Sequence, residues 1–423
     1  MKLRVYDDPA SVALRPFTWV RPASRLMVGV ERMQERWERL AAPHRAEVTL
    51  VTRALLAPIG RNRCAFSQVA PEVGDLWVSD LLVPEATSLA SLRTLEPDQV
   101  ARSQDRLIAF RLGTGMVAAL GSAEQREAEL SERLTRAAAA ASRTIELPDA
   151  RLLLGLADLL RHHEALIGPD LERLVGDLPP PALAPAAGYA TEAIRLGAGC
   201  RIDHGAVLDA REGPVVLAEG CEVEPHTWIK GPFFAGPRSR LLGGKIGSGS
   251  AVGLQCRIRG EVEASVALGF VNKAHDGFLG HSYLGEWINL GALTTTSDLK
   301  NNYSYVRLEL NGVEVPTGLK KVGSFLGDHV KTRIGCLLNT GTVVGLGANL
   351  FGDPAVAEKW VPDFAWGSGP GGSEYALDKF LETAEIVMGR RGEVLGPAER
   401  AILRAAFEGS QGLRDSRKAS PAR

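Results

Sequence analysis

The chain has 423 residues, of which 45% are hydrophobic and 23% are charged, and its formal net charge is −1. This length exceeds one ordinary domain and predicts two or three, while the balanced charge gives no electrostatic basis for binding nucleic acid or a membrane surface. The 5 cysteines are scattered without a CxxC pair, which indicates reduced thiols. No apolar run is long enough to cross a bilayer, so we expect a cytoplasmic protein without nucleic-acid or membrane partners.

The first segment, residues 1–178, differs in composition from the segment that follows it. Its first 110 residues contain only three glycines, Gly29, Gly60 and Gly74. Residues 122–176 are rich in alanine, leucine, glutamate and arginine, in a pattern typical of helices. The clustered prolines of "GDLPPPALAPAAG" then predict a stiff extended linker, which we place at residues 179–189 as a domain boundary.

The middle segment, residues 190–355, carries an internal repeat. Residues 188–352 hold 28 of the 46 glycines, and apolar residues recur there every six positions. The recurring positions are Leu196, Ile202, Leu208; Val223, Ile229, Ala235, Leu241; Ile246, Val252, Ile258; Leu284, Leu290; and Ile334, Thr340, Leu346. A period of six matches neither a helix nor an alternating strand, and it is typical of a parallel β-helix with small residues at its corners. A glycine-rich loop region or a β-sandwich with frequent turns is the alternative.

The repeat is interrupted once and then gives way to helices. An irregular insertion at residues 294–322 breaks the rhythm, and such insertions commonly cover a site. Solenoids with this rhythm usually trimerise, so we expect a homotrimer whose sites form between neighbouring subunits. Residues 356–423 are expected to form a helical extension that ends in a disordered tail, "RDSRKASPAR".

Four motifs inside the repeat carry a family resemblance. They are "RIRG" at 257–260, "GFVNK" at 269–273, "GHSYLGEWINLGA" at 280–292 and "SDLKNNY" at 297–303. In this order they resemble the hexapeptide-repeat acyltransferases, above all the acetyltransferase half of the bifunctional enzymes that make UDP-N-acetylglucosamine from glucosamine-1-phosphate. The N-terminal "DDPASVALRPFTWVRPASRLMVGVERMQERWERL" is similar to a variant branch in which a divergent sugar nucleotidyltransferase-like domain precedes the β-helix.

The resemblance covers residues 3–355 and implies both a fold and an activity. The implied fold is an α/β nucleotidyltransferase-like domain with a helical part, followed by a left-handed parallel β-helix. The implied reaction acetylates an amino sugar phosphate, such as glucosamine-1-phosphate, with acetyl-CoA, and extends to nucleotidyl transfer from UTP that forms a UDP-sugar. An acyltransferase for another amino sugar, and a non-catalytic or regulatory trimer that binds sugar nucleotides, are the alternatives, because fold alone does not fix function.

Acetyl transfer to an amine needs a base for the amine proton and donors for the developing oxyanion. Imidazole suits the role of base because it titrates near neutral pH, and the resemblance implies His281. In the family pattern two residues separate this histidine from the tyrosine, whereas "HSY" has one, so His275 is a second candidate. The alternative for His281 is a structural hydrogen bond along the face of the solenoid.

The resemblance also implies residues that bind the sugar phosphate and the acetyl donor. They are Arg259, Lys273 and Lys300 for the anionic phosphate, Tyr283 and Asn289 for the sugar hydroxyls or the amine, and the backbone around Ala292 for the pantetheine arm of CoA. A solvated face, with a ladder of side chains along the coils, is the alternative for these polar residues.

Nucleotidyl transfer requires groups that hold phosphates, and the glycine-rich GxGTRM-like loop of such enzymes is missing from the N-terminal segment. Arginine can replace backbone donors as a phosphate ligand, so the candidate nucleotide-binding residues are Arg15, Arg21 and Arg25, with Asp7 and Asp8 close upstream. The alternative is a surface strand and a helix, "ERMQERWERL", whose arginines and glutamates pair with each other. The resemblance leaves Mg²⁺ open for this domain.

Zinc is a further alternative, because β-helical trimers can hold zinc between subunits. A three-histidine site needs a third histidine beside His275 and His281, and the nearest are His226 and His329. This spacing is unfavourable, so we expect no metal in the β-helix.

Overall fold

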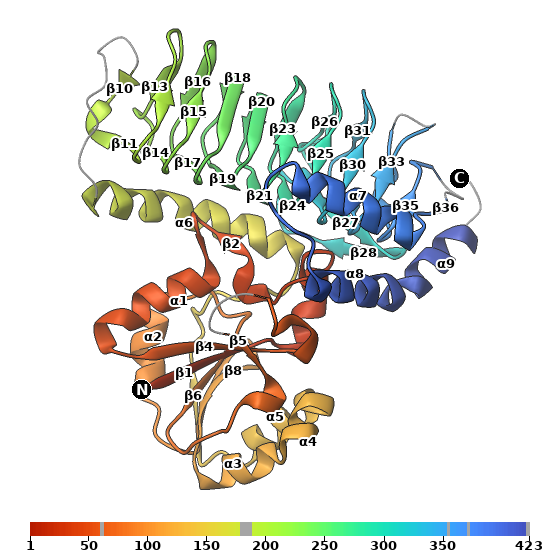
Figure 1. Ribbon diagram of the computed structural model, residues 1–423. Coiled ribbons are helices and arrows are strands. Elements are labelled where there is room, and N and C mark those ends of the chain that lie inside the picture. The colour runs from red at the N-terminus through yellow and green to blue at the C-terminus, as the bar shows by residue number, and fades with distance from the viewer. Residues whose placement is uncertain (60–62, 178–187, 353–355, 370–372, 420–423) are drawn as a thin grey trace. The chain divides into compact units, whose positions relative to one another are not determined.

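The computed structural model describes residues 1–59, 63–177, 188–352, 356–369 and 373–419 (Figure 1). The linker predicted at residues 179–189 lies outside the described residues, apart from residues 188 and 189. Internal contacts divide the chain into two compact units. Unit 1 comprises Met1–Leu26, Glu31–Asp158 and Gly396–Leu403, and unit 2 comprises Met27–Val30, Leu159–Leu395 and Arg404–Arg423. The boundary at residue 178 stays a prediction.

Unit 1 is built around a seven-stranded sheet. Its elements are β1 (Lys2–Tyr6), β3 (Glu31–Arg32), α1 (Met33–Ala41), β4 (Glu47–Thr52), β5 (Arg63–Ala65), β6 (Leu76–Ser79), α2 (Ala86–Arg93), β7 (Gln99–Ser103), β8 (Arg106–Arg111), α3 (Thr114–Leu120), α4 (Ala123–Ala128), α5 (Leu130–Ala139) and β9 (Arg143–Glu146). The strand order is β5-β4-β1-β6-β8-β7-β9, with β4 and β6 both parallel to β1.

Both faces of this sheet are covered. Leu3 and Val5 of β1 belong to one hydrophobic cluster, whereas Tyr6 belongs to another. Strand residues point alternately to opposite faces, and such two-sided burial is typical of sheets with helices on both sides. The α/β fold predicted for the N-terminal domain is confirmed.

Unit 2 contains the repeat, in which short strands stack one above another (Figure 1). Before the insertion its strands are β2 (Met27–Val28), β10 (Gly188–Tyr189), β11 (Ile194–Leu196), β12 (Arg201–Ile202), β13 (Val207–Asp209), β14 (Val215–Leu217), β15 (Glu222–Val223), β16 (Thr227–Lys230), β17 (Phe233–Ala235), β18 (Arg240–Ile246), β19 (Ser250–Leu254), β20 (Arg257–Glu263), β21 (Val266–Gly269), β22 (Asn272–Lys273), β23 (Phe278–Gly280), β24 (Tyr283–Glu286), β25 (Asn289–Leu290) and β26 (Thr295–Thr296).

The insertion forms an antiparallel hairpin of β27 (Arg307–Leu310) and β28 (Val313–Pro316), after which the coils resume. The later strands are β29 (Ser324–Leu326), β30 (Lys331–Thr332), β31 (Leu337–Leu338), β32 (Thr342–Val344), β33 (Asn349–Leu350), β34 (Trp360–Val361), β35 (Ala365–Trp366) and β36 (Ser373–Glu374). Successive coils pair in parallel, for example β16 with β18 and β21 with β24. The predicted parallel β-helix is confirmed.

The six-residue rhythm sets the core of the β-helix up to the insertion. Leu208, Val223, Ile229 and Leu284 lie in one buried cluster, as predicted. After the insertion the prediction is wrong at Ile334, which is 71% exposed, whereas the other two predicted positions, Thr340 and Leu346, are buried. The inward positions there are Leu326, Thr332, Leu338, Val344 and Leu350. The insertion resets the register, and Ile334 comes to lie beside the corner residue Gly335, whose φ is +65°.

Helices complete both units. They are α6 (Leu156–Asp177), α7 (Leu377–Gly389), α8 (Pro397–Gly409) and α9 (Gln411–Ala419). Within unit 2, Phe380 of α7 packs edge-on against Phe364, with ring centroids 5.0 Å apart. The tail predicted to be disordered from residue 414 is helical as far as Ala419, because it continues α9, and residues 420–423 lie outside the described residues.

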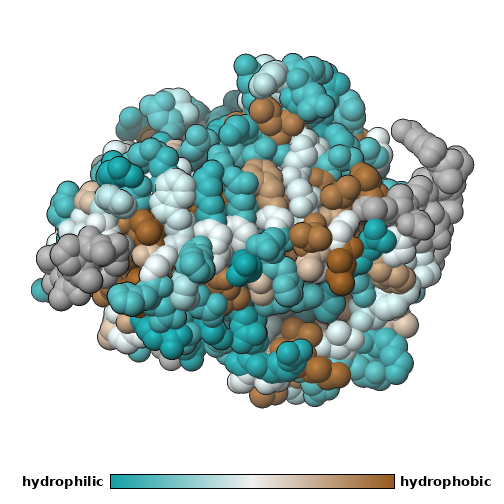
Figure 2. Space-filling model, turned by 90° about the horizontal axis from the view of Figure 1, so that it is seen from above, coloured by the Kyte–Doolittle hydropathy of each residue, from teal (hydrophilic) through white to brown (hydrophobic). Residues whose placement is uncertain are grey.

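The surface seen in Figure 2 is mostly hydrophilic, with hydrophobic residues scattered between hydrophilic ones. Scattered exposed apolar side chains are normal for a folded protein. Among the described residues, none of the helices combines the length and the apolar character that a membrane crossing requires.

Candidate active site

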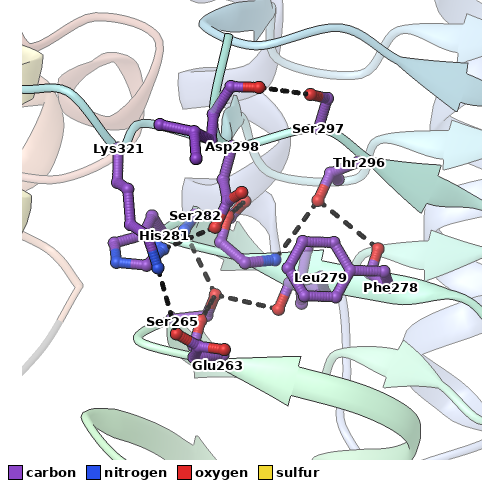
Figure 3. Close-up of polar contacts among 12 residues, drawn as sticks. Glu263, Ser265, Phe278, Leu279, His281, Ser282, Thr296, Ser297, Asp298 and Lys321 are labelled. Carbon is purple, nitrogen blue, oxygen red and sulfur yellow. Dashed lines mark hydrogen bonds and ion pairs between the residues drawn. The ribbon is translucent and has the colours of Figure 1, made fainter. Parts of the chain in front are cut away.

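His281 lies at a corner of the β-helix, directly after β23. Its φ is +42°, a left-handed conformation that it shares with Ala264 one coil earlier. Buried serines tie the coils together at this corner: the backbone N–H of Ser282 donates to Oγ of Ser265 at 3.1 Å (Figure 3). The backbone N–H of Ser324 donates to Oγ of Ser282 at 2.9 Å. The imidazole is therefore carried on a rigid turn.

Asp298 holds the His281 ring. Its Oδ2 lies 2.7 Å from His281 Nδ1, and the two side chains are 13% and 20% exposed (Figure 3). Burial alone would raise the pKa of Asp298, but the hydrogen bond and charge of His281, helped by Lys321, outweigh burial and leave that pKa below its usual value. Gly280 is required for this approach, because a Cβ there would lie 2.6 Å from Asp298 Oδ2.

The His281 ring borders a pocket of about 450 Å³ within unit 2. Charged lining residues gather around it, and Lys321 Nζ lies 3.5 Å from Glu263 Oε1. The lining residues are Leu160, His163, Glu164, Ile167, Pro232, Ser248, Gly249, Glu263, Ala264, His281, Leu319, Lys320 and Lys321. With Nδ1 engaged by Asp298, Nε2 is the His281 nitrogen that remains available as a base.

Helix α6 forms the wall of this pocket that faces the coils, and a hydrogen bond of His163 links the helix to the coils. Both nitrogens of the buried His163 ring lie near backbone oxygens, Nε2 2.9 Å from Gly249 O and Nδ1 3.2 Å from Gly29 O. Burial lowers the pKa of His163. These contacts fix the position of α6 over the corner that carries His281.

Tyr283 has a structural place, which differs from the sugar-binding role expected for it. Its side chain is fully buried, and its Oη donates to Met27 O at 3.0 Å and accepts from Met27 N at 3.1 Å. The phenol thereby satisfies the backbone N–H and C=O of Met27, in the short segment Met27–Val30, and its hydroxyl is already engaged by the protein.

Lys273, expected to bind phosphate, points into the β-helix. It stands in register with Ile258 of the inward column and is 2% exposed. Its Nζ donates to Arg259 O at 2.9 Å and also to His275 O. Burial lowers the pKa of this ammonium group to about 8. Lys273 therefore donates hydrogen bonds to backbone oxygens inside the coil.

The other expected site residues lie outside the His281 pocket in the single chain. Arg259 pairs with Asp276 at 3.1 Å, and His275 is exposed. The Lys300 Nζ donates to Tyr305 O at 3.2 Å. Ala292 O accepts from the N–H of Gly335 at 2.8 Å.

Asn289 belongs to the ladder that was the alternative for it. Its Oδ1 accepts from Nδ2 of Asn272, one coil earlier, at 2.7 Å. These placements separate Asn289 from the histidine, and a site shared between subunits stays a prediction.

Asp298 is a candidate functional residue that the sequence analysis did not predict, although it lies in the motif "SDLKNNY". Coil neighbours in this region are 17 residues apart, as in the pairing of Asn272 with Asn289. Asp298 lies 17 residues after His281, so the length of one coil predicts that the two side chains are neighbours.

A second candidate site lies in unit 1, where three carboxylates follow the parallel strands β1 and β6. Buried Asp80 accepts hydrogen bonds from the N–H groups of Asp8 at 2.9 Å and Ser24 at 3.2 Å. Burial, followed by the charge of Asp7, raises the pKa of Asp80 well above its usual value. Strand order reverses beside β1, and open α/β sheets bind ligands at such switch points.

A pocket of about 450 Å³ opens beside these carboxylates. Its lining includes Asp8, Arg102 and Arg106. The predicted arginines are placed differently: the Arg15 guanidinium lies 3.5 Å from the Trp19 ring centroid, Arg21 is buried, and Arg25 donates to Gln34 at 3.3 Å. None of these three is among the described residues that line this pocket.

The carboxylates of this second site already have hydrogen-bond partners in the chain. Asp7 and Asp8 already accept from Arg53 and Ser79, at 2.7 and 2.6 Å. Within the part of the chain that the structure describes, no group of three His, Cys, Asp or Glu side chains is arranged to hold a metal. Mg²⁺ therefore stays a prediction, and no step below depends on it.

Comparison with known proteins agrees with this two-part organisation. Residues 3–177 match the model of the sugar nucleotidyl transferase family. A bifunctional sugar-1-phosphate nucleotidylyltransferase/acetyltransferase of Sulfurisphaera tokodaii is 27% identical over 151 residues, which are 33% of this chain and 36% of the relative.

Two proteins named bifunctional protein GlmU are also similar. That of Anaeromyxobacter sp. is 38% identical over 109 residues, 24% of this chain and 20% of the relative, and that of Methanococcus vannielii is 30% identical over 103 residues, 23% and 25% of the two chains. The matched part of the chain spans about a third or less of the length of these curated relatives. The resemblance inferred from the motifs is confirmed, at low identity.

Proposed function

We propose that unit 2 transfers the acetyl group of acetyl-CoA to the amine of an amino sugar phosphate, on the premise that the chain resembles bifunctional nucleotidylyltransferase/acetyltransferases. The observation that carries the proposal is the His281–Asp298 pair, 2.7 Å apart, at the edge of a pocket. A histidine held by a carboxylate through one ring nitrogen presents the other as a general base. The homotrimer and the cytoplasmic location stay predictions.

The reaction assigns a task to each charged group of the pocket. The amine nitrogen attacks the thioester carbonyl, a C–N bond forms, the C–S bond breaks, and the CoA thiolate leaves and takes up the proton that His281 Nε2 removed from the amine. His281 Nε2 takes the amine proton, while the Asp298 carboxylate holds Nδ1–H and stabilises the imidazolium. Lys320 and Lys321 supply positive charge for the sugar phosphate, and Glu263 supplies an acceptor for the substrate amine or a hydroxyl.

Thiol release from acetyl-CoA tests this proposal directly. The purified full chain is expected to release CoA thiol when glucosamine-1-phosphate or another amino sugar phosphate is added, and to release none without an acceptor. A panel that also contains nucleotide-linked amino sugars distinguishes the acceptor. Binding of these sugars without thiol release would contradict acetyl transfer and favour the regulatory alternative.

We further propose that unit 1 binds the nucleotide of a sugar-nucleotide reaction in the pocket that contains Asp8, Arg102 and Arg106. The match of residues 3–177 to sugar nucleotidyl transferases supports it, as does the position of the pocket at the switch point of the sheet. The two arginines would hold phosphates in the absence of a glycine-rich loop.

Arg106→Gln is expected to lower kcat/KM for pyrophosphate release from UTP and N-acetylglucosamine-1-phosphate by roughly tenfold or more, because a charge-assisted phosphate contact is lost. Arg136→Gln is the matched control, since Arg136 is an exposed arginine on α5 that already pairs with Glu132. Equal loss in both variants, or no pyrophosphate release by the parent chain with any nucleoside triphosphate, would contradict the assignment.

A further inference from the structure

A second pocket of unit 2 lies at a different corner of the β-helix, between the coils and the end of α7. Its volume is about 300 Å³. The floor is an outward column in which Arg257, Asn272, Asn289 and Lys331 stand in register on successive coils. The full lining is Arg257, Phe270, Asn272, Trp287, Ile288, Asn289, Lys331, Val387, Arg390 and Arg391.

The charge of this pocket is strongly one-sided. Four of its lining residues are cationic and none is acidic. Elsewhere on the β-helix such charges are balanced: Arg240, the coil neighbour of Arg257, lies 3.1 Å from Glu222 and 2.9 Å from Glu224. The buried Nε of Arg257, like that of Arg240, has no hydrogen-bond partner among the described residues, but the Nε of Arg240 lies 3.1 Å from a glutamate oxygen.

Two of the other cations, Lys331 and Arg391, donate hydrogen bonds to backbone oxygens. Lys331 Nζ donates to His329 O at 3.1 Å, and Arg391 Nη1 donates to Gln255 O at 3.3 Å. Arg390 and Arg391 follow the carboxyl end of α7, where the helix dipole favours positive charge. The dipole does not account for Arg257 and Lys331, which belong to the coils.

Burial and the proximity of other cations lower pKa values in this cluster. Burial lowers the pKa of Lys331 to about 8. The pKa of Arg391 is lowered first by burial and then by the charge of Arg257. A bound anion would relieve this repulsion, because opposite charge at close range favours the ionised form of each cation.

We propose that this corner pocket binds the phosphate group of a small phosphorylated molecule. Arg257, Lys331, Arg390 and Arg391 supply the charge, and the amides of Asn272 and Asn289 supply neutral hydrogen-bonding groups. The stacked rings of Phe270 and Trp287, with centroids 3.9 Å apart, close one side. The volume suits a phosphate or diphosphate. The inference depends on neither acetyl transfer nor nucleotidyl transfer.

Calorimetric titration of the full chain tests the site, with inorganic pyrophosphate as the first probe at constant ionic strength. We expect saturable binding that Arg257→Gln and Arg390→Gln each weaken at least tenfold. Arg390 is exposed, so its variant keeps the test valid even if Arg257→Gln disturbs folding. Arg240→Gln, which removes a cation already paired with glutamates, is expected to leave binding unchanged.

Coenzyme A and UTP distinguish the sources of the phosphate. Selective weakening of coenzyme A binding in the two variants assigns the site to the diphosphate of the acetyl donor, and selective weakening of UTP binding assigns it to a nucleotide. Weakening of pyrophosphate alone assigns it to the free anion. If neither variant weakens any of the three probes, or if Arg240→Gln weakens them equally, the proposal is overturned.

Discussion

His281→Gln is expected to lower kcat/KM for acetyl transfer by roughly 10²–10⁴-fold, the range that a positioned general base contributes. Glutamine has a similar reach and a polar end but cannot accept the amine proton near neutral pH. The measurement is thiol release from acetyl-CoA over a series of acceptor concentrations. Because the side chain lies on a corner held by Ser265 and Ser282, the substitution leaves the coils intact.

Asp298→Asn distinguishes a role of Asp298 in orienting the His281 ring from a role in folding. Its amide can donate to Nδ1, which would leave the proton on Nε2 and block the base, so kcat is expected to fall roughly 10²-fold or more. The KM for acetyl-CoA is expected to stay near that of the parent chain, which a general loss of structure would not allow.

The matched control is His275→Gln, at the exposed histidine six residues before His281. It is expected to retain activity close to that of the parent chain. Full activity of His281→Gln, with activity lost in His275→Gln, would transfer the role of base to His275 and refute the pairing with Asp298.

The second large effect is a pH dependence of stability caused by Lys273. In the folded chain its pKa is lowered to about 8, against 10.5 for an ordinary lysine, a difference worth roughly 3 kcal/mol. Below pH 8 the ammonium is charged in both states, and its burial destabilises the fold. Between pH 8 and 10.5 the unfolded chain binds more protons than the folded chain, so stability rises with pH.

Lys273→Met removes the contribution of this titration to the free energy of unfolding and keeps an unbranched side chain in the inward column. The free energy of unfolding of the parent chain, minus that of the variant, is expected to increase by roughly 3 kcal/mol from pH 8 to pH 10.5. Urea titrations at several pH values measure it. Lys245→Met is the control, because Lys245 is 51% exposed and its ammonium contacts water in both states. A flat difference for both variants would mean that Lys273 is hydrated in the folded chain.

The fold was largely predictable because its determinants are local and repeated. Inward residues such as Val223 and Leu241 recur at a fixed interval, and a small repeated unit leaves few ways to bury them. The prediction failed at Ile334, where the insertion reset the phase, since no local signal marks where a coil begins again.

The site was predictable only in part, because most of its geometry comes from stacking. His281 was found by its motif. Asp298 could be predicted only from the length of one coil. The burial of Lys273 could be predicted only from the register of the inward column, because lysines are mostly exposed and the residue type gives no sign of burial. The family motifs gave Lys273 and Tyr283 ligand-binding roles, whereas their polar atoms are engaged by backbone groups.

The short segment Met27–Val30 has a consequence for dividing the molecule. Its backbone oxygens contact the buried hydroxyl of Tyr283 and the Nδ1 atom of His163, yet it precedes both residues by more than a hundred positions in the chain. A fragment starting at residue 188 would lack both this segment and α6, and with them the two hydrogen bonds between Tyr283 Oη and Met27, which together contribute about 1–3 kcal/mol. Cleavage in the proline-rich segment would therefore yield a β-helix that lacks the contacts of Met27 with Tyr283 and of His163 with Gly249.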